Sequence, residues 1–176
     1  MGKETIDKEV APDVSGIGAK PRKLWNINYI RLMCSNFLLF FAFFLLTPLL
    51  PIYLSDMFHA DKDTIGLVLS GYVIAALIVR PFSGFIVDTF DRKRVLVICF
   101  FFFFICFAGY IAAGTLLMFA IVRTLHGLPF GATTVANSTA AIDVLPSERR
   151  NEGIGYYGLS NNLAMAIAPS AGVYLY

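Results

Sequence analysis

The sequence contains 176 residues, of which 57% are hydrophobic and only 15% are charged. Soluble domains carry about 25% charged residues, and a soluble chain of this length cannot bury 17 phenylalanines together with its other apolar side chains. The formal net charge of +2 is too small to indicate binding to nucleic acid. The composition therefore predicts a membrane protein for which the lipid bilayer is the solvent of much of its surface.

Five apolar runs follow one another along the chain, and each is long enough for a membrane-spanning helix of about 20 residues. Residues 1–24 precede them, and we expect this polar segment, which has no periodicity, to be a disordered tail. Residues 25–176 are then expected to form an all-α, polytopic transmembrane helix bundle. The expected spans are residues 29–50, 65–87, 95–113, 116–145 and 153–176.

Basic residues gather on one side of the expected bundle. Every lysine and arginine outside the spans, with the exception of Lys62, lies before the first span or in the connections at 88–94 and 146–152. An excess of lysine and arginine marks the cytoplasmic loops of membrane proteins. We therefore expect the N-terminus and these two connections to face the cytoplasm.

The connection after the second span reads GFIVDTFDRK and places two charges of opposite sign four residues apart. Asp88 and Arg92 can form a charge-assisted hydrogen bond at the membrane surface if the helix persists or turns tightly. Such a pair can latch two helix ends together and release them when they part. Gly84 lies one turn before Asp88, and we expect its missing side chain to let another helix approach closely.

This segment resembles the loop motif G-x-L-A-D-R-x-G-R-K of the major facilitator superfamily. Thr89 replaces the usual arginine, and Asp91 replaces the usual glycine, where we expect it to tolerate a left-handed turn. The resemblance implies that Asp143, near the end of the fourth span, joins the latch. The alternative interpretation is a charged loop that follows the basic-residue rule, with Asp143 as surface charge. The positions that match the motif are Gly84, Asp88, Arg92 and Lys93.

The fourth span contains RTLHGLPFGA, in which Arg123, Gly127 and Gly131 recur every four residues and share one helical face. An arginine inside a membrane span is costly and indicates a functional site. The segment is similar to the R-x-x-x-G-x-x-x-G pattern in the fourth helix of the same family. That resemblance implies that Arg123 faces a central cavity and assists proton transfer or substrate binding. Thr134 and Asn137 lie near the same face, and the open alternative is a helix-packing face.

The fifth span carries small residues at a spacing typical of close helix packing. Ala168 and Gly172 continue a small-residue ridge, and Pro169 is expected to kink the helix. The segment partly matches the G-x-x-x-G-P-x-x-G-G motif of the family's antiporters, which favours an exporter. Tight helix packing explains the same residues equally well.

Polar side chains on the remaining helix faces complete the expected substrate-binding surface. Tyr29 and Asn36 lie near one face of the first span, beside phenylalanines that suit an amphipathic organic substrate. Asn162 of the fifth span is expected to contribute as well. No Asp or Glu lies in the middle of a span, so a proton-coupled mechanism would use His126 or a group outside this chain.

The resemblance implies a secondary transporter with twelve helices in two halves, so we expect this chain to be the N-terminal part of a larger protein. We expect export of small amphipathic organic compounds by alternating access, with protons as one candidate coupling ion. Uptake of a sugar or other metabolite, and a non-transporting scaffold subunit, are the alternatives. The expected location is a bacterial inner membrane, and the remaining helices are the expected protein partner. We expect no enzyme activity, cofactor, metal or nucleic acid, since the sequence shows no catalytic set, phosphate loop or metal-ligand spacing.

Overall fold

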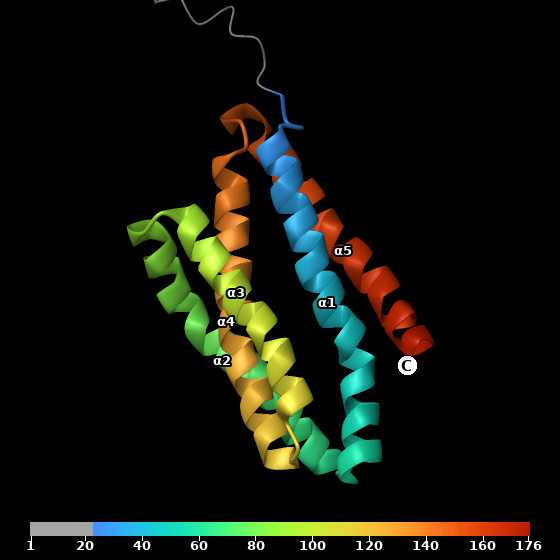
Figure 1. The fold of residues 1–176 in the computed structure, drawn as a ribbon. Coiled ribbons are helices and arrows are strands. Elements are labelled where there is room, and N and C mark those ends of the chain that lie inside the picture. The colour runs from blue at the N-terminus through green and yellow to red at the C-terminus, as the bar shows by residue number, and fades with distance from the viewer. Residues whose placement is uncertain (1–22) are drawn as a thin grey trace, which may run out of the picture.

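The computed structural model describes residues 23–176, and these residues form helices and no β-strand (Figure 1). The all-α class expected from the sequence is confirmed. Most of the segment expected to be a tail lies outside the described residues. The helices are α1 Ile27–Phe58, α2 Lys62–Thr89, α3 Arg92–Ala112, α4 Leu116–Asp143, the short 3₁₀ helix η1 Ser147–Arg149 and α5 Arg150–Leu175.

Side-chain caps explain where the first four α-helices begin. Asn26, Asp61, Asp91 and Thr115 each accept a hydrogen bond from the backbone N–H three residues later. Such a cap satisfies one of the backbone donors that a helix start leaves unpaired. The expected left-handed turn at Asp91 was wrong, because its φ is −58° and its role is to cap α3.

The first helix is longer than the apolar run suggested. It continues through Pro48 and Pro51 to Phe58, and it ends where His59 adopts the left-handed conformation with φ 51°. Figure 1 shows α1 changing direction in its cyan part, which contains the two prolines. Proline removes a helix hydrogen bond and commonly bends a helix. Beyond Pro48, Leu50 and Leu54 of α1 pack in one apolar cluster with Val68 of α2 and Phe119 of α4.

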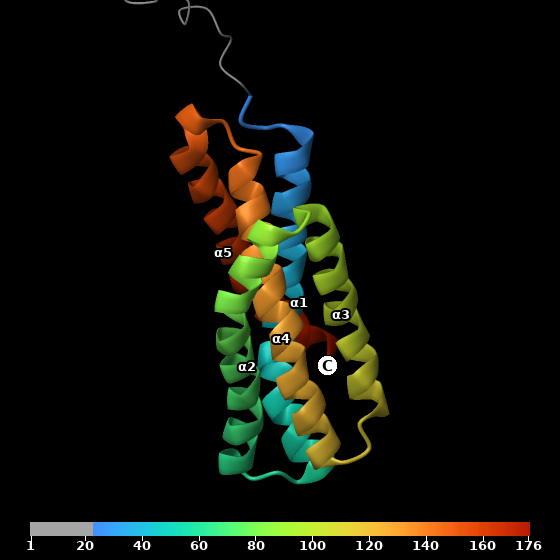
Figure 2. The same ribbon diagram turned by 90° about the vertical axis from the view of Figure 1, so that its left-hand side faces the viewer.

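The closest helix pairs are not neighbours in sequence. The most extensive packing joins α2 to α4, followed by α1 to α5 and α3 to α4 (Figures 1 and 2). Since the chain reverses at each connection, α2 and α4 run in the same direction, as do α1 and α5. α4 contacts each of the other four α-helices, so its residues reach every part of the bundle.

Four helices, α1 to α4, are long and apolar enough to cross a membrane. Large apolar side chains cover their outward faces, including Leu67 of α2 at 74% exposure and Phe101 of α3 at 61%. Exposed apolar surface of this extent is typical of helices in lipid. α5 has the length of a span, with 26 residues, but it is more polar because it contains Ser160, Asn161 and Asn162.

The N-terminal end of α1, the α2–α3 connection and the α4–α5 connection all lie at one end of the bundle (Figure 1). These are the segments in which the sequence concentrates its basic residues. The fold thus brings most basic residues of the described chain to one end, with Lys62 at the other end and Arg80 and Arg123 within α2 and α4. That this end faces the cytoplasm stays a prediction.

Candidate functional site

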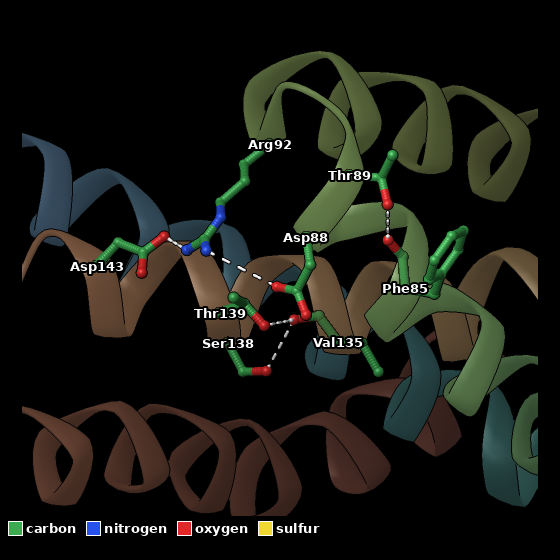
Figure 3. Close-up of polar contacts among 8 residues, drawn as sticks. All are labelled: Phe85, Asp88, Thr89, Arg92, Val135, Ser138, Thr139 and Asp143. Carbon is green, nitrogen blue, oxygen red and sulfur yellow. Dashed lines mark hydrogen bonds and ion pairs between the residues drawn. The ribbon is translucent and has the colours of Figure 1, made fainter.

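A charged contact joins three helices at the end of the bundle that carries the basic residues (Figure 3). Arg92 is the first residue of α3, and its guanidinium forms an ion pair with Asp143, the last residue of α4. Arg92 Nη2 also lies 3.8 Å from Oδ1 of Asp88, near the end of α2. The structure thus brings together the three charged residues that the sequence suggested for a latch. We call this set the charged contact.

Solvent limits the strength of the charged contact. The side chains of Arg92, Asp143 and Asp88 are 36%, 44% and 73% exposed. Exposed ion pairs of this kind contribute about 0 to 1 kcal/mol each. Hydroxyl groups nearby do not compete for the carboxylates, because Thr89 and Thr139 donate to carbonyl oxygens of their own helices (Figure 3). The charged contact therefore contributes little to the stability of the fold.

Three other residues near this end lie outside the charged contact. No atom of the described residues lies within 4 Å of a Cβ built on Gly84, so the expected close helix approach there is absent from this structure. Lys93 is exposed. Arg149 hydrogen-bonds to both carboxylate oxygens of Glu152 at 2.8 Å, and this interaction raises the pKa of Arg149.

A second polar site lies inside the bundle, between α2, α3 and α4. Arg123 of α4 is only 5% exposed, and its guanidinium carbon lies 3.9 Å from the ring centre of Tyr72 on α2. Its Nη1 donates a hydrogen bond of 3.3 Å to the hydroxyl of Tyr110 on α3. That hydroxyl also lies 2.9 Å from Nδ1 of His126. We call Arg123, Tyr72, Tyr110 and His126 the arginine cluster.

Aromatic rings enclose the arginine cluster. The ring of His126, which is 1% exposed, lies 4.7 Å from the ring of Phe103 and 5.1 Å from that of Phe107, centre to centre. Because Arg123 lies over an aromatic face, a cation–π interaction of about 2 kcal/mol or more offsets part of its desolvation. That Arg123 has a functional role stays a prediction. In the described chain, however, its side chain is buried between helices and does not line an open cavity.

The small residues of the sequence motifs mark close backbone contacts. A Cβ on Gly127 would lie 2.2 Å from the carbonyl oxygen of Tyr72, and one on Gly131 would lie 2.5 Å from that of Ala76. α4 therefore packs against α2 along its two glycines. Gly172 makes the equivalent contact between α5 and α1, where a Cβ would lie 2.4 Å from the carbonyl oxygen of Leu45.

The neighbouring motif residue Ala168 is fully buried. α5 continues without a break through Pro169 to Leu175. Both residues therefore belong to a continuous helix whose small residues pack against α1. This is the packing alternative that the sequence left open for the fifth span.

Several residues expected to line a cavity are instead buried contacts between helices. The hydroxyl of Tyr29 donates to the carbonyl oxygen of Gly153 at 2.6 Å. Asn36 Nδ2 donates to Ser160 Oγ at 2.9 Å. Tyr29 is 0% and Asn36 1% exposed, so both side chains connect α1 with α5. For these two residues, the expectation of an open binding face does not hold in the described chain.

Asn137 connects three helices. From α4, its Nδ2 donates to the carbonyl oxygen of Leu32 on α1 at 3.2 Å and to the hydroxyl of Tyr157 on α5 at 2.8 Å. Asn137 is 0% exposed, which again corrects the expectation of a cavity-lining side chain. Thr134 is partly exposed and donates to its own helix at Gly131, whereas Asn162 is exposed on α5.

Reasoning from the sequence missed the tyrosines that partner the key polar residues. Tyr72 and Tyr110 contact Arg123, and Tyr157 contacts Asn137. α3 and α4 are antiparallel and joined by a short connection at Gly114, but Tyr110 and Arg123 lie at different distances from it. No local rule therefore leads from the sequence to these three tyrosines.

Among residues 23–176, no group of three or more His, Cys, Asp or Glu side chains is placed to hold a metal ion. Cys34, Cys99 and Cys106 are free thiols. The polar chemistry of the described chain is thus concentrated in the charged contact and the arginine cluster. Together with the apolar helices, these features define a polytopic helical membrane protein with a buried cation in its interior.

Comparison with known proteins gives the family. The family model described as Major Facilitator Superfamily matches residues 32–176, which is most of the chain. The chain therefore belongs to the Major Facilitator Superfamily. It is an integral membrane protein, as the apolar helices α1 to α4 also indicate.

Curated relatives are similar over most of this chain. The chain is 24% identical over 139 residues to the quinolone resistance protein NorA of Staphylococcus aureus strain MRSA252, which covers 79% of this chain and 36% of NorA. It is 24% identical over 147 residues to multidrug resistance protein 2 of Bacillus subtilis strain 168, covering 84% of this chain and 36% of that relative. The chain thus spans about a third of the length of the curated relatives it matches.

Proposed function

We propose that the protein is part of a secondary active transporter that exports small amphipathic organic compounds from a bacterial cell by alternating access. The observation that carries this proposal is the similarity to relatives named for quinolone resistance and multidrug resistance, within a family to which the chain belongs. The apolar and aromatic character of the helices supports an amphipathic substrate. The membrane we propose is the bacterial inner membrane, with the N-terminus in the cytoplasm.

The charged contact gives the proposal a conformational element. It joins the ends of α2, α3 and α4 through side chains that remain partly solvated. An ion pair of about 0 to 1 kcal/mol biases two states by no more than about fivefold. We propose that it stabilises one state of the transport cycle, in which these helix ends are closed, and opens in the other.

The arginine cluster is the proposed link to the coupling ion or the substrate. A buried cation in a membrane span indicates a functional role, and Arg123 has no Asp or Glu partner among the described residues. We propose protons as the coupling ion. Among the residues that the sequence predicted to line a substrate-binding surface, Thr134 and Asn162 are not fully buried and are the most accessible to a substrate.

A transport experiment with the native protein tests the proposal. Cells that express it are expected to accumulate less of a fluorescent quinolone, and less ethidium, than cells with an empty vector. An Arg123→Ala variant of equal abundance is expected to lose most of this difference. Faster uptake of a labelled sugar with unchanged dye content would instead support a metabolite importer. Equal accumulation of every compound would support a scaffold subunit and contradict transport.

A further inference from the structure

The hydroxyl of Tyr110 lies between two nitrogen groups of the arginine cluster. It is 3.3 Å from Nη1 of Arg123 and 2.9 Å from Nδ1 of His126. Tyr110 belongs to α3, whereas both partners belong to α4. A single hydroxyl on one helix therefore connects the two polar side chains of another.

The guanidinium fixes the direction of one of these hydrogen bonds, whereas the ring of His126 can donate or accept, depending on its tautomer. A guanidinium has only donors, so the oxygen of Tyr110 must accept from Arg123. The tyrosine proton is then free to be donated. Among residues 23–176, the only acceptor near it is Nδ1 of His126. Donation from Arg123 to Tyr110 and from Tyr110 to His126 gives the tyrosine proton an acceptor, whereas a protonated Nδ1 would leave that proton without one among residues 23–176.

This direction determines the form of the imidazole. Nδ1 can accept a hydrogen bond only when it carries no proton, so the single proton of the neutral ring lies on Nε2. Nε2 of His126 is buried and has no hydrogen-bond partner among the described residues. The ring of His126 packs against the rings of Phe103 and Phe107, and the face of an aromatic ring is a weak acceptor for an N–H group. In this arrangement the arginine cluster carries one positive charge, on Arg123.

We propose that Tyr110 is a positioning residue that holds Arg123 in place and fixes His126 as the neutral Nε2–H tautomer. The role in transport rests on the proposed function, whereas the hydrogen-bond chain itself does not. Loss of the hydroxyl would remove the one hydrogen-bond acceptor that the described chain offers to Arg123. It would also leave Nδ1 of His126 without a donor in a buried, aromatic environment.

Solid-state NMR of the native protein in lipid bilayers, with ¹⁵N-labelled histidine, reads the tautomer directly. A His126→Asn variant lacks the signals of His126 and so identifies them in the spectrum of the native protein. The proposal expects an unprotonated Nδ1 and a protonated Nε2 for His126. It also expects the Nδ1 signal to shift in a Tyr110→Phe variant. A protonated Nδ1, or no shift in that variant, would overturn the proposal.

Transport of the fluorescent quinolone tests the functional part with a matched control. Tyr110→Phe is expected to lower the efflux rate about tenfold, the worth of a hydrogen bond to a charged group. Tyr53→Phe is the control, because Tyr53 is also partly buried but its hydroxyl makes no hydrogen bond within the described chain. Equal rates for the two variants would refute the positioning role.

Rescue distinguishes a hydrogen-bond acceptor from a space-filling ring. His126→Asn retains an acceptor near the position of Nδ1 and is expected to keep more efflux than His126→Leu. The reverse order would contradict the proposal. If the wild-type protein exports no compound tested, the proposed function fails, and the tautomer of His126 still decides whether the hydrogen-bond chain exists.

Discussion

Replacement of Gly127 by alanine tests the packing that positions the arginine cluster. The new Cβ would lie 2.2 Å from the carbonyl oxygen of Tyr72, whereas ordinary contacts begin near 3.4 Å. α2 and α4 would therefore have to separate locally by about 1 Å, and overpacking of this kind costs about 1–3 kcal/mol. The separation also moves the Tyr72 ring away from Arg123, which now lies 3.9 Å from its centre.

Gly84→Ala is the matched control, because a Cβ on Gly84 meets no atom of the described residues within 4 Å. Both variants gain the higher helix propensity of alanine, worth about 1 kcal/mol, so this contribution cancels in the comparison. Thermal unfolding in detergent should place the melting temperature of Gly127→Ala roughly 2–12 °C below that of Gly84→Ala. Equal melting temperatures would refute the close packing of α4 on α2.

Three further predictions follow from the contacts between helices. Asp143→Asn should slow transport in vesicles more than Asp88→Asn does, because Asp88 is 73% exposed and lies 3.8 Å from Arg92. Each substitution should lower the free energy of unfolding by no more than about 1 kcal/mol. A larger effect of Asp88→Asn on the transport rate would contradict the geometry. Tyr29→Phe should cost about 1 kcal/mol of stability through its lost 2.6 Å hydrogen bond, whereas Tyr174→Phe, at a 90% exposed position, should leave the unfolding curve unchanged. Asn137→Ala should lower the melting temperature while Asn162→Ala does not, because only Asn137 is buried and hydrogen-bonded to α1 and α5. The opposite ranking would favour the earlier interpretation of Asn137 as a cavity-lining residue.

The charged contact shows how far local spacing leads. Asp88 and Arg92 are four residues apart, and that spacing alone predicted their proximity. Asp143 lies far away in sequence, and only resemblance to the family suggested its part. The structure explains the connection, because α4 ends beside the beginning of α3. The role of Asp91 was predicted wrongly, because aspartate is favoured both at the start of a helix and in a tight turn.

The interior polar residues show why the rest could not be predicted. A polar stripe on an apolar helix has the same periodicity whether it faces a cavity or another helix. Asn36 and Asn137 therefore matched a binding face in sequence and proved to be contacts between helices. Arg123 was identified from its cost in a membrane, but its partner Tyr72 comes from α2, which pairs with α4 through tertiary packing alone.

The most direct test of the proposed function is export by the purified native protein in proteoliposomes. Vesicles with the protein should move a fluorescent quinolone against its concentration gradient when a proton gradient is imposed. This movement should stop when a protonophore collapses the proton gradient, and vesicles with the Arg123→Ala variant should not move the quinolone. Movement that does not depend on the proton gradient would contradict proton coupling. No movement of any amphipathic compound by the active, folded protein would contradict export.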